Sequence, residues 1–210
     1  MRSVGAKPDL ACYNSLLKAC ILSGDIDKTK DVIRRMAADD IEPNSNTLRS
    51  TLKAARKSKR SDIADAIWNY AVRYKKKKDA SPFKPRLSDV ELLLSVYLSE
   101  LRSTTSHEER CLINKKIMNL YEGIVNRSED RGLNHLSVSD VEDNQDFMLA
   151  VLRAAVSNEL HAPTKEEKIH SKELACDIAG MEMFQYKFPQ HVDRASKKAL
   201  TLAQDWMWAY

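Results

Sequence analysis

The sequence predicts an all-α fold, an α-solenoid of helix-turn-helix repeats. The first observation is a match between residues 35 positions apart, in which residues 1–9 align with residues 36–44 and residues 15–23 with residues 50–58. The second is that apolar residues within each unit recur at helical spacing. Neither helix of a unit is long enough to be stable alone. Stacking of successive helix pairs, which produces a solenoid, is therefore the expected architecture.

The first complete unit, residues 10–44, is expected to form two helices. Tyr13 and Leu17 begin an apolar series at helical spacing, which predicts the first helix. Gly24 breaks the chain, and Asp25 or its neighbour can cap a second helix that stops before Pro43.

Residues 10–44 closely resemble a pentatricopeptide repeat. The Tyr-Asn-Ser-Leu-Leu opening, the Gly before the second helix, the late Met and the Pro-Asn close all lie where that family places them. By this resemblance, residues 1–79 contain the tail of one repeat, one intact repeat and one degenerate repeat. The full protein is then expected to begin upstream of Met1. The resemblance also implies that the solenoid is a right-handed superhelix.

The repeat pattern weakens beyond residue 44. Arg49 stands where Asn14 stood, and Lys59 stands where Gly24 stood. The run Lys75–Lys78 is either a solvated helix end and loop or a phosphate-contacting patch, and residues 80–87 are expected to form a basic linker.

Residues 88–210 are expected to form degenerate helical-hairpin repeats that continue the solenoid. Ser88, Ser106 and Thr164 begin capping boxes, each just before an apolar periodic segment. These boxes and the apolar periodicity predict helices at about 89–102, 108–127, 144–158, 165–186 and 191–209. Residues 126–143 are expected to form a long connection. The aromatic residues at 206–210 either pack in a helix core or form an exposed docking surface.

Charge is distributed unevenly along the 210 residues. Residues 1–86 contain 20 Lys/Arg against 10 Asp/Glu, whereas residues 87–210 contain 14 against 20. A polyanion would bind the basic half. No apolar run approaches the roughly 18 residues that span a bilayer, so we expect no membrane insertion. The first residues show no targeting segment.

The sequence offers no catalytic motif, and we expect the chain not to be an enzyme. It has no HExxH motif, no Gly-rich phosphate loop, and no His-x-Glu with paired cysteines, which a cytidine-deaminase-like extension would need. The four widely spaced cysteines are expected to be reduced thiols that pack as small hydrophobic residues, with a zinc site as the alternative. No metal or cofactor is expected.

The resemblance to pentatricopeptide repeats assigns RNA-contacting roles in the intact repeat. Asn14 and Asn44 occupy its two base-reading positions, and an Asn amide offers both donors and acceptors to a base edge. The Asn/Asn combination implies a pyrimidine, with cytosine preferred over uracil. Ala11 and Asn46 occupy the base-flanking positions, where the family usually has larger aliphatic residues.

Four basic residues on the first helices of the two units are candidates for phosphate contact. Lys57 matches the family's phosphate-contacting lysine, and Lys18, Lys53 and Arg56 lie on the same helices. The alternative is that they are ordinary surface residues. One intact and one degenerate repeat would supply roughly 2–6 kcal/mol through stacked bases, short of the roughly 12 kcal/mol of nanomolar binding.

Two functions follow as expectations. The first is an organellar protein, mitochondrial or chloroplast by resemblance, that binds single-stranded RNA in RNA processing, stability or translation. The second is an architectural subunit that contacts proteins in a large organellar assembly such as a mitochondrial or plastid ribosome. The acidic balance and the aromatic end of the second half favour the second function.

Overall fold

The computed structural model describes residues 8–73, 84–126, 133, 136–181, 184 and 192–208. Helices and no strands occur within these ranges, which confirms the predicted all-α class. None of the helices described there is long and apolar enough to cross a bilayer. The chain divides into two compact units, the first holding helices α1 to α5 and the second holding α6 to α11.

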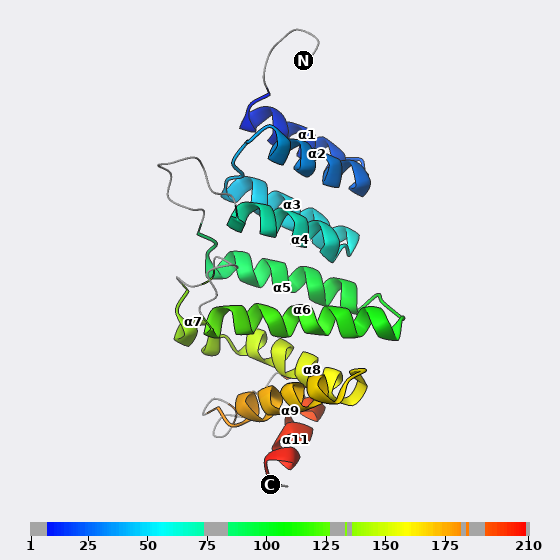
Figure 1. The fold of residues 1–210 in the computed structure, drawn as a ribbon, viewed down its shortest axis with the longest axis vertical. Coiled ribbons are helices and arrows are strands. Elements are labelled where there is room, and N and C mark those ends of the chain that lie inside the picture. The colour runs from blue at the N-terminus through cyan, green and yellow to red at the C-terminus, as the bar shows by residue number, and fades with distance from the viewer. Residues whose placement is uncertain are drawn as a thin grey trace. The chain divides into compact units, whose positions relative to one another are not determined.

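Unit 1 consists of two helical hairpins and a fifth helix. Its helices are α1 (Leu10–Leu22), α2 (Ile26–Ala38), α3 (Ser45–Ser58), α4 (Ser61–Arg73) and α5 (Leu87–Leu101). The first hairpin pairs α1 with α2 and the second pairs α3 with α4 (Figure 1). Between the hairpins, α1 contacts α3 and α2 contacts α4, while α5 packs on α3 and α4. Lys75–Lys78 and residues 80–83 of the predicted linker lie outside the described residues, and Leu87 already belongs to α5.

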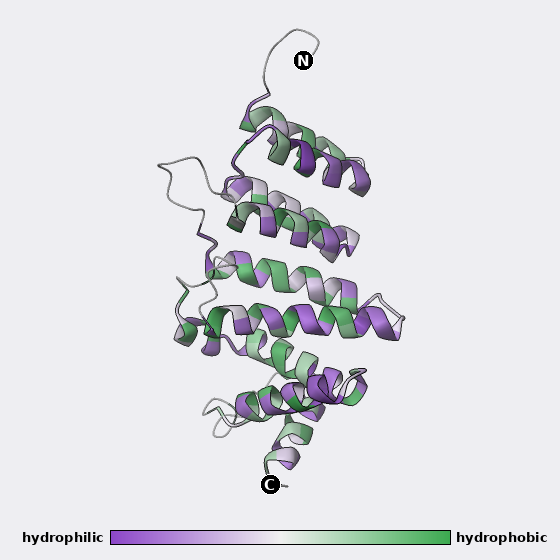
Figure 2. Ribbon diagram, viewed as in Figure 1, coloured by the Kyte–Doolittle hydropathy of each residue, from purple (hydrophilic) through white to green (hydrophobic). Residues whose placement is uncertain are grey.

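The buried residues of unit 1 repeat with the 35-residue period seen in the sequence. Seven pairs of buried residues are related by this spacing: Tyr13/Leu48, Leu17/Leu52, Cys20/Ala55, Thr29/Ala64, Val32/Ile67, Ile33/Trp68 and Met36/Ala71. On α5, Val90, Leu94 and Tyr97 are buried 42 residues after Leu48, Leu52 and Ala55. Figure 2 shows α5 as largely hydrophobic, whereas α2 is largely hydrophilic. Helices α1, α3 and α5 therefore share one pattern of core positions, and α2 and α4 share another.

The helix ends in unit 1 are set by local side-chain caps. The Asp9 and Asn44 side chains, 35 residues apart, accept the backbone N–H of Cys12 (2.8 Å) and Thr47 (2.9 Å) at the starts of α1 and α3. Asp25 caps α2, as predicted. Gly24 has a φ of 70°, and Lys59, at the equivalent position before α4, has a φ of 56°.

Unit 2 is arranged around one central helix. Its helices are α6 (His107–Val125), α7 (Val138–Glu142), α8 (Gln145–His161), α9 (Lys165–Ala179) and α11 (Arg194–Trp208). The central helix, α8, contacts α6, α7, α9 and α11. Residues on most sides of α8 are buried, among them Phe147, Met148, Val151, Leu152 and Ala155.

Some predicted helix boundaries are wrong. Helix α5 begins at Leu87 rather than 89, because the Asp89 carboxylate accepts the N–H of Arg86 (2.9 Å) and Ser88 is not the cap. Within the predicted connection 126–143, α7 forms. Helix α9 ends at Ala179, short of residue 186. Thr164 does cap α9, accepting the backbone N–H of Glu167 at 3.2 Å.

Candidate nucleic-acid interface

A row of exposed cations follows the first helices of the two hairpins. It consists of Lys18 on α1 and of Lys53, Arg56 and Lys57 on α3, all four exposed. Asn14 and Lys18 are four residues apart and therefore lie on one helix face. Lys53 repeats the position of Lys18 after 35 residues. Within the described residues, no ion pair engages any of these four side chains. Their charge is therefore open to a ligand.

The structure brings the two predicted base-reading residues together around Thr47. The hydroxyl of Thr47 donates to Asn14 Oδ1 at 2.6 Å, and the backbone N–H of Thr47 donates to Asn44 Oδ1 at 2.9 Å. Both amide oxygens therefore act as acceptors inside the protein. Among the described residues, neither Nδ2 group donates to an acceptor. The two Nδ2 groups thus offer hydrogen-bond donors to a ligand.

The predicted base-flanking residues are both exposed. Asn46 lies in the first turn of α3. Ala11 lies in the first turn of α1 and lines an open hollow of about 800 Å³, together with Tyr13 and Leu16. The small side chain of Ala11 leaves this hollow open to a bulkier group.

In the second hairpin an ion pair replaces the Asn14–Thr47 hydrogen bond. Arg49, 35 residues after Asn14, donates from Nε to Asp89 Oδ1 at 2.6 Å. Asp89 is the third residue of α5, as Thr47 is of α3, and its side chain is only 1% exposed. The contact has the same place in the two hairpins but a different chemistry. From the sequence, Arg49 is recognisable only as the residue that replaces Asn14. Its partner Asp89 does not stand out, because it follows at an altered spacing.

The cation row ends at α3. When α5 is aligned with α3 on their first residues, Glu91, Ser95 and Ser99 take the places of Arg49, Lys53 and Lys57. The Ser99 hydroxyl donates to the backbone carbonyl of Arg56 at 3.1 Å, so this side of α5 is used for packing against α3. The row is thus limited to the two hairpins.

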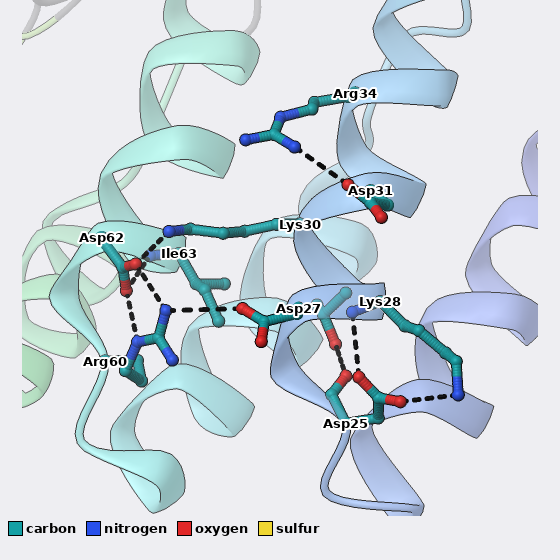
Figure 3. Close-up of polar contacts among 10 residues, drawn as sticks. Asp25, Asp27, Lys28, Lys30, Asp31, Arg34, Arg60, Asp62 and Ile63 are labelled. Carbon is teal, nitrogen blue, oxygen red and sulfur yellow. Dashed lines mark hydrogen bonds and ion pairs between the residues drawn. The ribbon is translucent and has the colours of Figure 1, made fainter.

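Basic residues at the contact of α2 with α4 are neutralised, in contrast to the row. Arg60 donates to Asp62 from Nε and Nη2 at 2.9 and 2.7 Å, and Lys30 of α2 also pairs with Asp62 (Figure 3). Asp27, at 3.8 Å, is a second partner of Arg60. The Arg60 guanidinium, followed by Lys30, holds the pKa of Asp62 well below its usual range. These cations hold the second hairpin to the first.

The described residues reveal no metal centre. No group of three or more His, Cys, Asp or Glu within them could hold a metal ion. All four cysteines are free thiols, and Cys20 and Cys111 are buried.

The chain matches no protein-family model, no curated protein and no solved structure. Membership of the pentatricopeptide family therefore stays a prediction that depends on residues 1–79.

Proposed function

We propose that this chain binds single-stranded RNA along α1 and α3, as a right-handed α-solenoid of pentatricopeptide type. Its place of action is a mitochondrion or chloroplast, in RNA processing, stability or translation. The observation that carries the proposal is the exposed cation row next to the Asn14–Thr47–Asn44 bridge. It joins a surface for phosphates to a pair of amide donors.

The amide donors favour a base that presents acceptors. With both Oδ1 atoms held by Thr47, the two Nδ2 groups can donate to the acceptors of a pyrimidine, which are O2 and N3 in cytosine and O2 and O4 in uracil. Phosphates on either side of that base would meet Lys18 and Lys53. In single-stranded RNA the Watson–Crick edges of the bases are unpaired, whereas a duplex uses them for base pairing.

The geometry also limits the strength of binding. Arg49 is held by buried Asp89, so the second hairpin lacks the amide pair that the first one has. One stacked base contributes about 1–3 kcal/mol. Phosphate contacts supply the rest and weaken with salt. We therefore expect weak, salt-sensitive binding by the residues described here.

The base preference is tested by removing one donor while keeping the helix cap. Asn44→Asp keeps an acceptor for the Thr47 N–H, because Asp caps helices as well as Asn does, but it loses Nδ2. The control, Asn69→Asp on an exposed site of α4, adds the same charge. We expect fluorescence anisotropy with short C-rich and A-rich RNAs to show a reduced preference for C in the first variant alone. An unchanged preference in both variants would contradict base reading.

A second candidate function is the architectural subunit of an organellar ribonucleoprotein, such as a ribosome. Its specific support is Trp208 at the end of α11, which is 87% exposed, and Leu22 at the end of α1, which is also exposed. Aromatic side chains such as that of Trp208 are enriched at protein–protein interfaces. Sedimentation of the protein with a large complex after RNase treatment would support this function, and a free monomer in extracts would oppose it.

A further inference from the structure

Arg49 stands on α3 at the position that Asn14 has on α1, 35 residues earlier. Lys53 lies four residues beyond Arg49, as Lys18 lies four residues beyond Asn14, so Arg49 and Lys53 share one helix face. The Arg49 side chain is 38% exposed, although it pairs with a buried carboxylate. In the second hairpin, an accessible guanidinium therefore takes the place of a base-reading amide.

The guanidinium of Arg49 is held along one of its two hydrogen-bonding edges. Its Nε donates to Asp89 Oδ1 at 2.6 Å, and its Nη2 donates to Ser88 Oγ at 2.8 Å. A guanidinium has five N–H donors in a rigid plane, so these two bonds leave three. The second edge consists of the other N–H of Nη2 and one N–H of Nη1. No described residue supplies an acceptor to that edge, so Arg49 presents a fixed pair of parallel donors.

A pair of parallel N–H donors favours a base with two neighbouring acceptors. Guanine offers O6 and N7 on one edge, and bidentate contact of Arg with these two atoms is common in specific protein–DNA recognition. Adenine has the N6 amino donor next to N7, and uracil has N3–H between O2 and O4. Cytosine also has neighbouring acceptors, O2 and N3, but its N4 amino group lies beside N3 and would repel the N–H that bonds there. Guanine is therefore the base that best matches the free edge of Arg49.

We propose that Arg49 recognises guanine in the nucleotide next to the pyrimidine that Asn14 and Asn44 contact, so that the two hairpins read bases of different chemistry. This inference rests on the proposed binding of RNA along α1 and α3. The pair with Asp89 assists recognition, because a guanidinium that is already fixed in its plane loses less side-chain entropy when a base binds. The buried ion pair thus orients Arg49 as well as joining α3 to α5.

The test compares short RNAs that bind the full chain at low salt, measured by fluorescence anisotropy. Each RNA is a run of uridines with one central nucleotide, which is guanosine, adenosine or 7-deazaguanosine. The last of these has a C–H in place of N7, so it keeps O6 and loses the neighbouring acceptor. The uridines offer no pair of neighbouring acceptors that would compete for Arg49. We expect the guanosine RNA to bind at least about fivefold more tightly than either of the others.

A variant protein assigns this difference to Arg49. Arg49→Asn combined with Asp89→Thr replaces the guanidinium by an amide and keeps between α3 and α5 the kind of contact that Asn14 and Thr47 form. The double variant should bind the guanosine and 7-deazaguanosine RNAs with equal affinity. The control, Arg34→Asn, removes an exposed Arg of α2 and should keep the full difference.

Equal binding of the guanosine and 7-deazaguanosine RNAs by the parent chain would overturn the inference and leave RNA binding along α1 and α3 intact. A difference that persists in the double variant would also overturn it, because another donor would then contact N7. Binding of no RNA in the series would refute both the inference and the proposed function. The comparison of RNAs needs the parent chain alone, so it decides even if the double variant does not fold.

Discussion

The ion pair between Arg49 and Asp89 joins α3 to α5, and its removal should destabilise unit 1 strongly. Arg49→Ala leaves the Asp89 carboxylate, 1% exposed, with the N–H of Arg86 at 2.9 Å as a remaining donor. Breaking a buried pair by removing one partner costs about 3–5 kcal/mol. Arg49 itself is 38% exposed, and Asp89 keeps a backbone bond. We therefore expect a loss of about 2 kcal/mol in the free energy of unfolding.

A surface ion pair in the same unit provides the matched control. Arg34 pairs with Asp31 at 2.9 Å on α2, with side chains 75% and 55% exposed. Exposed pairs of this kind contribute little, so Arg34→Ala should cost less than about 0.5 kcal/mol. Both variants replace an Arg by Ala. They differ in the carboxylate that loses its partner, which is buried for Asp89 and exposed for Asp31.

Urea unfolding followed by tryptophan fluorescence measures both variants. Trp68 is buried in α4 and is the tryptophan of unit 1; replacing Trp206 and Trp208 by Phe isolates its signal. Equal losses for Arg49→Ala and Arg34→Ala, within about 0.5 kcal/mol, would refute the role given to the buried pair.

A rescue variant tests whether the two hairpins use equivalent contacts. Arg49→Asn combined with Asp89→Thr recreates on α3 and α5 the pair that Asn14 and Thr47 form at 2.6 Å. If the positions are equivalent, the double variant should be more stable than Arg49→Asn alone, by about 1 kcal/mol. A double variant no more stable than Arg49→Asn would contradict the equivalence.

Three further changes have expected outcomes of known sign. Gly24→Ala should cost about 1 kcal/mol, because its φ of 70° strains a residue with a side chain; no clash adds to this cost, since a Cβ there meets no atom within 4 Å. Lys59→Gly, at a φ of 56°, should raise the free energy of unfolding by up to about 1 kcal/mol. Urea midpoints that move in the same direction for both variants would contradict this. Because folding lowers the pKa of Asp62, its carboxylate stabilises the fold above the unfolded pKa of 3.8, and this stabilisation is lost as the pH falls below that value. The free energy of unfolding of Asp62→Asn should therefore depend less on pH in the acid range. A pH profile equal to that of the parent chain would contradict this expectation. Asp193→Ala removes the acceptor of the Ala195 and Ser196 N–H groups at the start of α11 and should cost about 1 kcal/mol by thermal unfolding, whereas no change would argue against the cap.

The repeat was predictable from the sequence because burial imposes it. Tyr13 and Leu48 are both buried, as are Leu17 and Leu52, and each pair is 35 residues apart. Because a buried position favours an apolar side chain, burial makes the apolar residues recur at this spacing. The cap at Asp25 was predictable for a similar reason, because a cap depends on residues within one turn.

The remaining contacts depend on distances that the sequence does not display. Asp89 lies 40 residues beyond Arg49, and the added residues before α5 shift it out of the 35-residue register. The capping motif at Ser88 was misassigned because Asp89 offers a competing acceptor to Arg86. Helix α7 has five residues, too few to show a helical period.

The salt dependence of RNA binding tests the central claim most directly. Each phosphate contact to a single strand contributes a slope of about −0.7 to the plot of log affinity against log salt, so the four cations of the row predict at most about −2.8. Lys53→Glu should make this slope less negative by about 0.7, whereas Arg34→Glu, an equal charge reversal on α2, should leave it unchanged. A slope near zero for the parent chain, or equal changes in the two variants, would contradict RNA binding along α1 and α3.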